Sequence, residues 1–194
     1  MERLLYFFFL LLLNILISCN ESRDGLTKDK METVEYVDID KFMGDWYVIA
    51  NIPTFIEKEA TNAIESYRLD DEGNIATTFT FYKESSPDKI TKYTPKGFIV
   101  NKKTNAEWEM QFVWPFKSKF LIIYLDQNYE TTVIGHPSKN YVWIMSREPE
   151  IDNFKYTSIM NELSSIGYDL KKIQKVPQKW NLSLIHISEP TRLP

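Results

Sequence analysis

The strongest constraint on the fold is a succession of short segments rich in apolar and aromatic side chains, separated by turn-forming residues. Strands are predicted at residues 45–50, 62–69, 74–82, 94–100, 106–113, 120–125, 131–135 and 141–146. Short strands that follow one another through hairpin-length connections, such as the turn Asp70-Asp71-Glu72-Gly73, are typical of an up-and-down barrel. We therefore expect an all-β domain built as an eight-stranded antiparallel barrel.

After the eighth strand the apolar period changes from that of a strand to that of a helix. One helical face would carry Tyr156, Ile159, Met160, Leu163 and Ile166. Asp152 is a suitable N-cap and Gly167 a suitable C′ residue. A helix with one apolar stripe needs a surface to cover, so we expect a C-terminal α-helix packed on the outside of the barrel, followed by a short ninth strand at 173–176.

The first residues have the pattern of a bacterial lipoprotein signal. An apolar run over 4–13 is too short to span a bilayer, and Leu16-Ile17-Ser18-Cys19 matches a lipobox. We expect a signal peptide over 1–18, a lipid anchor on Cys19 and a flexible tether over 19–36, with an uncleaved anchor helix as the alternative. Asn20 stands where an inner-membrane retention Asp would be, which favours the outer membrane as the location.

The domain is expected to cover residues 37–180. Residues 181–194 resemble the conceptual translation of a sequencing adapter and are not expected to be native; a genuine extension is the alternative. Cys19 is the single cysteine, so an internal disulfide is impossible.

Charge and residue inventory argue against a nucleic-acid partner and against an enzyme. The formal net charge is −4 and the basic residues are scattered. Apart from the tail, His136 is the one histidine, and it lies in a turn. The chain shows no metal-ligand spacing, phosphate loop or nucleophile elbow, so we expect no metal and no cofactor. Glu65 and Glu109 could face inward as a carboxylate pair, but outward-facing, solvated positions are favoured.

Three short blocks in order resemble the lipocalin family, and within it the bacterial outer-membrane and apolipoprotein D-like branch. They are Gly44-Asp45-Trp46-Tyr47, Asp126-Gln127-Asn128-Tyr129 and Arg147. The second block departs from the common Thr-Asp-Tyr form. The resemblance spans about 37–178 and implies that Gly44, Trp46, Tyr129 and Arg147 close one end of the barrel, with the Arg147 guanidinium across the Trp46 indole.

At the other end, alternate connections would surround an open mouth, at 51–58, 83–92, 114–118 and 136–140. The expected ligand-binding residues there are Ile52, Phe55, Ile56, Trp114, Phe116, Lys117, Lys119 and Lys139. Ordinary loop packing and solvation are the alternatives for these apolar and charged residues.

The resemblance implies a protein that binds a fatty acid or lysophospholipid, with the acyl tail in the barrel and the anionic headgroup near the mouth lysines. A second hypothesis is an envelope interaction protein whose barrel is filled by side chains. A lipid-modifying enzyme is a third. The sequence leaves open whether the protein is a monomer or a homodimer.

Overall fold

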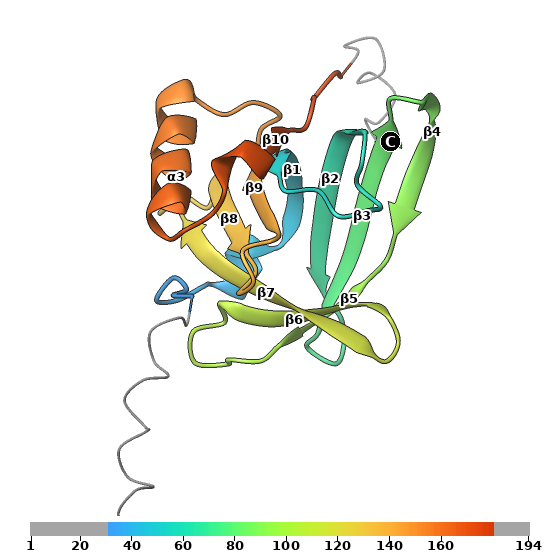
Figure 1. Ribbon diagram of the computed structural model, residues 1–194. Coiled ribbons are helices and arrows are strands. Elements are labelled where there is room, and N and C mark those ends of the chain that lie inside the picture. The colour runs from blue at the N-terminus through green and yellow to red at the C-terminus, as the bar shows by residue number, and fades with distance from the viewer. Residues whose placement is uncertain (1–30, 181–194) are drawn as a thin grey trace, which may run out of the picture. The chain divides into compact units, whose positions relative to one another are not determined.

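The computed structural model describes residues 31–180, so the predicted signal peptide, the predicted lipidation site Cys19 and the tail from residue 181 lie outside the described residues. Within this part of the chain the strands form one sheet (Figure 1). Their bounds are β1 (Gly44–Asn51), β2 (Ala60–Leu69), β3 (Ile75–Lys83), β4 (Ser86–Tyr93), β5 (Lys96–Ile99), β6 (Glu107–Val113), β7 (Phe116–Leu125), β8 (Thr131–Gly135), β9 (Val142–Ser146) and β10 (Gln174–Lys175).

The sheet closes into the expected eight-stranded antiparallel barrel, because β1 pairs with β2 on one side and with β9 on the other. The eight staves are β1, β2, β3, the combined β4 and β5, and β6 to β9. A register shift in the pairing of β1 with β9, between Val48 and Ala50, lies where the other edge of β1 passes from β2 to β10. Such a shift inserts an extra residue and increases the local bend, as barrel walls require.

The fourth stave differs from the prediction because it is longer and is broken in two. A tight turn at Glu84 and Ser85 replaces the expected loop, and β4 begins at Ser86. The break follows Tyr93, where Pro95 has no backbone N–H to donate. The Pro95 carbonyl still accepts a hydrogen bond from the Thr77 amide, at 3.2 Å. β4 pairs with β3, whereas β5 pairs with both β3 and β6.

The domain has two apolar cores, and β1, β7, β8 and β9 contribute buried side chains to the outer one. The inner core lies inside the barrel and includes Trp46, Tyr67, Phe81 and Trp108. The outer core lies between the barrel wall and α3 (Asn153–Ser165). The inward-facing side chains of β2 lie directly opposite those of β3. Tyr67, for example, is the register partner of Thr77.

Helix α3 covers the outside of the barrel as predicted. The Asp152 carboxylate accepts hydrogen bonds from the amides of Phe154 and Lys155, at 2.9 and 3.1 Å, and so caps the first turn. Gly167 ends the helix with a φ of +91°, a conformation that a Cβ would disfavour. The stripe buries Ile159 and Leu163, and the chain continues through η1 (Leu170–Lys172) to β10, the expected short ninth strand.

The segment before β1 closes one end of the barrel, which the sequence analysis did not predict. It contains α2 (Ile39–Phe42), capped by the Asp38 side chain. The fully buried Phe42 ring lies 5.1 Å from the Trp46 ring and 5.4 Å from the Trp108 ring, centroid to centroid. Val34 donates a backbone hydrogen bond to Ile122, and Met31 is buried, so the packed domain begins inside the stretch expected to be a tether.

Candidate ligand-binding barrel

Arg147 holds the closed end of the barrel together. Its guanidinium carbon lies 3.8 Å from the centroid of the Trp46 ring, which is the contact that the resemblance implied. The same group donates to the carbonyls of Asp45 at 2.7 Å and Met43 at 2.8 Å. Further carbonyl acceptors are those of Lys41, Phe42 and Tyr129. The arginine therefore bridges β1, β9, α2 and the β7–β8 turn.

Gly44 and Tyr129 support this closure in different ways. Gly44 has a φ of +99°, and a Cβ there would lie 3.2 Å from Nη1 of Arg147, so a side chain would strain the backbone and crowd the guanidinium. The Tyr129 hydroxyl accepts a hydrogen bond from the Asp38 amide at 2.8 Å. Gly44 and Tyr129 thus both hold the backbone at the closed end of the barrel. Their role is structural, and they lie away from the barrel mouth.

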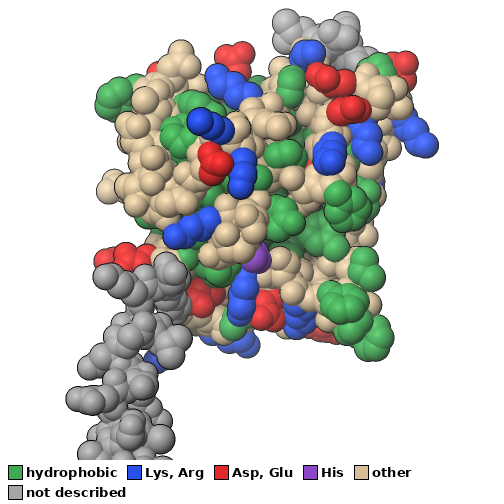
Figure 2. Space-filling model, viewed as in Figure 1, with side chains coloured by type: hydrophobic (Ala, Val, Ile, Leu, Met, Phe, Trp, Pro, Cys, Tyr) green, Lys and Arg blue, Asp and Glu red, His purple; other side chains and the backbone are tan. Residues whose placement is uncertain are grey.

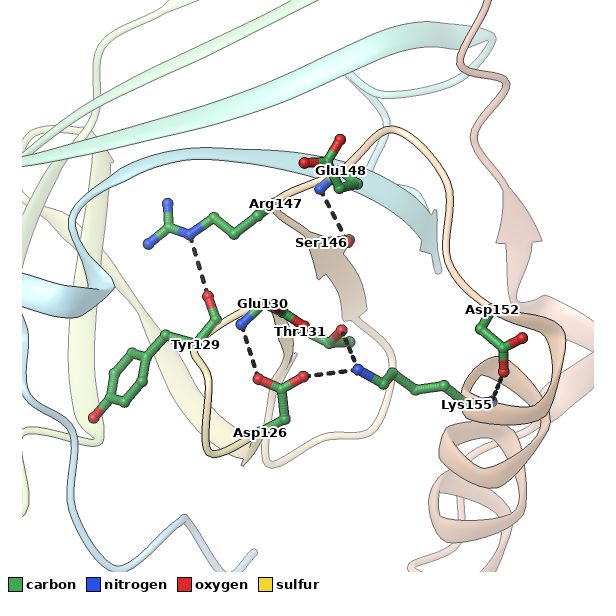
Figure 3. Close-up of polar contacts among 9 residues, drawn as sticks. All are labelled: Asp126, Tyr129, Glu130, Thr131, Ser146, Arg147, Glu148, Asp152 and Lys155. Carbon is green, nitrogen blue, oxygen red and sulfur yellow. Dashed lines mark hydrogen bonds and ion pairs between the residues drawn. The ribbon is translucent and has the colours of Figure 1, made fainter.

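The β7–β8 turn ties the closed end to the outer helix (Figure 3). Asp126 accepts hydrogen bonds from the Glu130 amide at 2.8 Å and from Lys155 Nζ of α3 at 2.9 Å. Partial burial opposes the charge of Asp126, but these hydrogen bonds, led by that from Lys155, lower its pKa below the ordinary value. The second sequence block thus anchors α3 as well as the floor of the barrel.

The interior above this floor is lined with aromatic rings. The Trp108 and Phe120 rings stack with centroids 5.3 Å apart, and the Tyr67 ring meets Trp108 edge-on at 5.8 Å. Phe79 and Phe81 of β3 continue the lining at 5.0 Å from each other. An apolar, aromatic wall of this kind is what a site for an apolar ligand needs.

Glu65 lies inside the barrel, contrary to the favoured outward position. Its side chain is in phase with Ala63 and Tyr67, and the Tyr67 hydroxyl donates a hydrogen bond to it. Burial raises the pKa of Glu65 to about 7, although the Tyr67 hydrogen bond acts against this and the charge of Glu57 adds to it. The sequence shows that Glu65 and Tyr67 lie on the same face of the strand. Because Glu65 and Arg68 put a charge on each face, the sequence does not show which face is buried.

Glu109 does face outward, so the two glutamates do not form a pair. Its carboxylate lies 3.0 Å from Lys119 Nζ and 3.8 Å from Lys117 Nζ on the outer surface of β6 and β7. The Lys117 ammonium also stands 3.8 Å from the centroid of the Phe98 ring. Two of the predicted mouth lysines therefore already have a partner.

Glu57, within the connection predicted at 51–58, is a second buried carboxylate. The β1–β2 loop folds it inward, where Oε1 accepts hydrogen bonds from Trp143 Nε1 at 2.7 Å and Asn51 Nδ2 at 3.2 Å. Oε2 accepts from the Thr54 amide at 2.8 Å. With each oxygen bonded, Glu57 fixes the loop that borders the mouth.

The aromatic residues of the expected apolar rim are strongly exposed. Phe55 is 85 % exposed, Trp114 81 % and Phe116 76 %. Figure 2 shows hydrophobic side chains gathered at the end of the β6–β7 hairpin. Ile56 is half-buried, whereas Ile52 is buried in the outer core and does not reach the rim.

The β8–β9 connection carries Lys139 and His136. A Cβ on Gly167 would lie 3.2 Å from Lys139 Nζ, so this ammonium stands at the C-terminus of α3, where the helix dipole favours a positive charge. His136 Nδ1 lies 2.7 Å from the Ser138 hydroxyl, and partial burial lowers its pKa. His136 thus organises its own turn.

A closed barrel of eight strands, with a packed floor and an aromatic interior, defines a class of proteins that enclose one small apolar ligand. The family model described as "Lipocalin-like domain" matches residues 37–178. The chain belongs to the lipocalin family, in the group of the Blc lipoproteins and apolipoprotein D. Members of this family are in general binding and transport proteins.

Individual relatives agree with this assignment. "Temperature-induced lipocalin-1" of Arabidopsis thaliana is 26% identical over 166 residues, covering 78% of this chain and 84% of the relative. "Outer membrane lipoprotein Blc" of Escherichia coli K12 is 26% identical over 147 residues, covering 75% and 81%. Among solved structures, insecticyanin of the tobacco hornworm Manduca sexta superposes with a TM-score of 0.61 at 16% identity, covering 79% of this chain and 86% of that one, which shows the shared fold.

No group of three or more His, Cys, Asp or Glu side chains within residues 31–180 is arranged to hold a metal ion. No helix in the same range has the length and apolar character needed to cross a bilayer.

Proposed function

We propose that this lipocalin binds a lipid amphiphile, a fatty acid or lysophospholipid, with its acyl tail among the inner aromatic residues and its anionic headgroup at the mouth. The observation that carries the proposal is the exposed aromatic rim of Phe55, Trp114 and Phe116 at the end opposite to the Arg147 closure. Monomeric proteins seldom expose large rings together unless the rings contact a ligand, membrane or partner.

The energetics favour a tail inside the barrel. Burying an acyl chain is worth about 0.8 kcal/mol per methylene, or on the order of 10 kcal/mol for a long chain, before ordering costs are subtracted. A headgroup at the mouth would compete with Glu109 for Lys117 and Lys119. Because exposed ion pairs contribute only about 0 to 1 kcal/mol, this competition costs little.

The proposed setting is the outer membrane, through a lipid anchor on Cys19. It is supported by the lipobox and by the relatives whose names describe outer membrane lipoproteins. Metabolic labelling with a fatty acid should mark the wild-type protein, and Cys19→Ala should abolish the label and release the protein from membranes. Labelling that persists in Cys19→Ala would refute the anchor.

Ligand binding is tested on delipidated protein by displacement of a fluorescent fatty acid with hexadecanoic acid and with a lysophospholipid. We expect saturable displacement in the micromolar range or tighter. The competing hypothesis is an interaction protein with a filled barrel, and it predicts no displacement at any lipid concentration below the micelle threshold. A lipid-modifying activity would instead appear as turnover by mass spectrometry.

A further inference from the structure

Three buried polar side chains lie together at the deep end of the barrel. Glu65 and Tyr67 belong to β2 and Thr77 to β3, and they are 7%, 0% and 4% exposed. Tyr67 and Thr77 are register partners, and Glu65 is the register partner of Trp46 on the β1 side. All three therefore stand just above the Trp46 floor, far from the exposed rim.

The hydrogen bonding of this group is incomplete. The Thr77 hydroxyl is buried and has no hydrogen-bond partner among the residues that the structure describes. Within residues 31–180 the Glu65 carboxyl receives one hydrogen bond, from Tyr67, although a carboxylate can accept about four. Buried polar atoms normally find partners, and one left without costs about 1 to 3 kcal/mol.

The neighbours of these groups along β3 are apolar, and the described part of the wall supplies no partner for the Thr77 hydroxyl. Phe79, the register partner of Glu65, is an aromatic residue of the lining, and Ile75 is fully buried two residues before Thr77. A purely apolar tail would leave the Thr77 hydroxyl and the Glu65 oxygens unsatisfied. A ligand with one polar group at its inner end would satisfy both.

We propose that Glu65, Tyr67 and Thr77 form an anchor for a hydroxyl group at the buried end of the ligand. The ligand hydroxyl donates to Glu65 and accepts from Thr77, while Tyr67 orients the carboxyl. This inference rests on the proposed function and refines its ligand class to a long-chain acid that also carries a hydroxyl near its far end.

The charge distribution fixes the direction in which such a ligand enters. Burial makes the charge of Glu65 costly and raises the pKa of its carboxyl. A carboxylate or phosphate at the deep end would be buried beside the Glu65 carboxyl, where two negative charges are costly. The anionic end is therefore kept at the mouth, and a neutral hydroxyl is accepted at the floor.

The strand length sets the spacing between the two ends of the ligand. β2 runs from Ala60 near the mouth to Glu65 near the floor. At about 3.3 Å per residue this is roughly 17 Å along the strand. The ligand must separate its acidic and hydroxyl ends by about that distance, which calls for a long chain.

The test compares hexadecanoic acid with 16-hydroxyhexadecanoic acid as competitors for a fluorescent fatty acid on the delipidated full chain. We expect the hydroxy acid to bind the wild-type protein about tenfold more tightly. Thr77→Val keeps the side-chain shape and should reduce the preference to within twofold. Glu65→Leu should do the same, and Glu65→Gln should retain part of the preference because the amide still bonds the hydroxyl. Thr78→Val, on the outward face of β3, is the matched control.

The possible failures are distinct. If the wild-type protein binds both acids equally, or if Thr77→Val and Glu65→Leu keep the full preference, the anchor is refuted and the proposed lipid binding stands. If neither acid nor the probe binds, the proposed function itself is refuted. Circular dichroism of each variant shows whether the barrel remains folded, and Glu65→Gln covers the case in which Glu65→Leu is misfolded.

Discussion

Replacement of Arg147 by Met tests how much of the domain's stability comes from the closed end. The change keeps most of the side-chain volume but removes the guanidinium that donates hydrogen bonds to carbonyls of β1, α2 and the β7–β8 turn. It also removes the contact with the Trp46 ring at 3.8 Å. The half-buried arginine thus stabilises the folded domain through several interactions, and the substitution removes all of them at once.

The size of the effect follows from these contacts. One hydrogen bond per guanidinium nitrogen, at about 1 kcal/mol each in this partly exposed position, gives about 3 kcal/mol. The contact with the indole adds about 1 kcal/mol. The expected loss is therefore about 4 kcal/mol, a large share of the 5 to 15 kcal/mol typical of a domain, and the melting temperature should fall by roughly 8 to 16 °C.

The assay is equilibrium urea unfolding followed by tryptophan fluorescence, with Arg68→Met as the matched control on the exposed end of β2. The control should change stability by no more than about 0.5 kcal/mol. Arg147→Lys keeps the charge but lacks the planar fork, so it should lose at least half as much as Arg147→Met. A loss below about 1 kcal/mol for Arg147→Met would refute the reasoning.

Three further predictions concern the barrel interior, the closure and the rim. Because the pKa of Glu65 is raised from 4.5 to about 7 in the folded state, its contribution to stability is full below pH 4.5 and decreases as the pH rises to 7. The decrease should be at most about 3 kcal/mol, and urea midpoints should show it absent in Glu65→Gln but present in Glu109→Gln. Gly44→Ala should lower the free energy of unfolding by about 1 to 3 kcal/mol because of its φ of +99°, and an unchanged midpoint would contradict this. The double change Trp114→Ser and Phe116→Ser should leave the melting temperature within about 2 °C, since both rings are exposed, while slowing uptake of fatty acid from vesicles severalfold in stopped-flow fluorescence.

Much of the fold was predictable because period and turn chemistry agree along most of the chain. Asp152 and Gly167 bracket α3 as their capping chemistry indicates. Strand β4 was missed because both of its faces are largely exposed and carry mostly polar residues. Its sequence therefore shows no alternation of apolar and polar side chains. The segment before β1 was missed because α2 is a single turn whose stability comes from burying Phe42.

The candidate site was less predictable than the fold. The rings of Phe55, Trp114 and Phe116 are exposed at the rim, but the sequence could not show that Ile52 turns to the outer core. The inward position of Glu65 depends on register, since a slip by one residue exchanges the faces of a strand. Glu57 is buried only because a loop folds it onto Trp143, a contact between distant residues.

The break in the fourth stave has a consequence for how the protein behaves at high concentration. Within residues 31–180, β4 pairs with β3 alone, and it lies at the side of the sheet in Figure 1. No strand of this part of the chain covers its other backbone edge, which could accept a strand from a second molecule. Pro87, Lys89 and Lys92 lie along this edge and discourage such pairing through a missing amide and like charges. The colloidal stability of the barrel therefore depends on three residues that contribute nothing to its core.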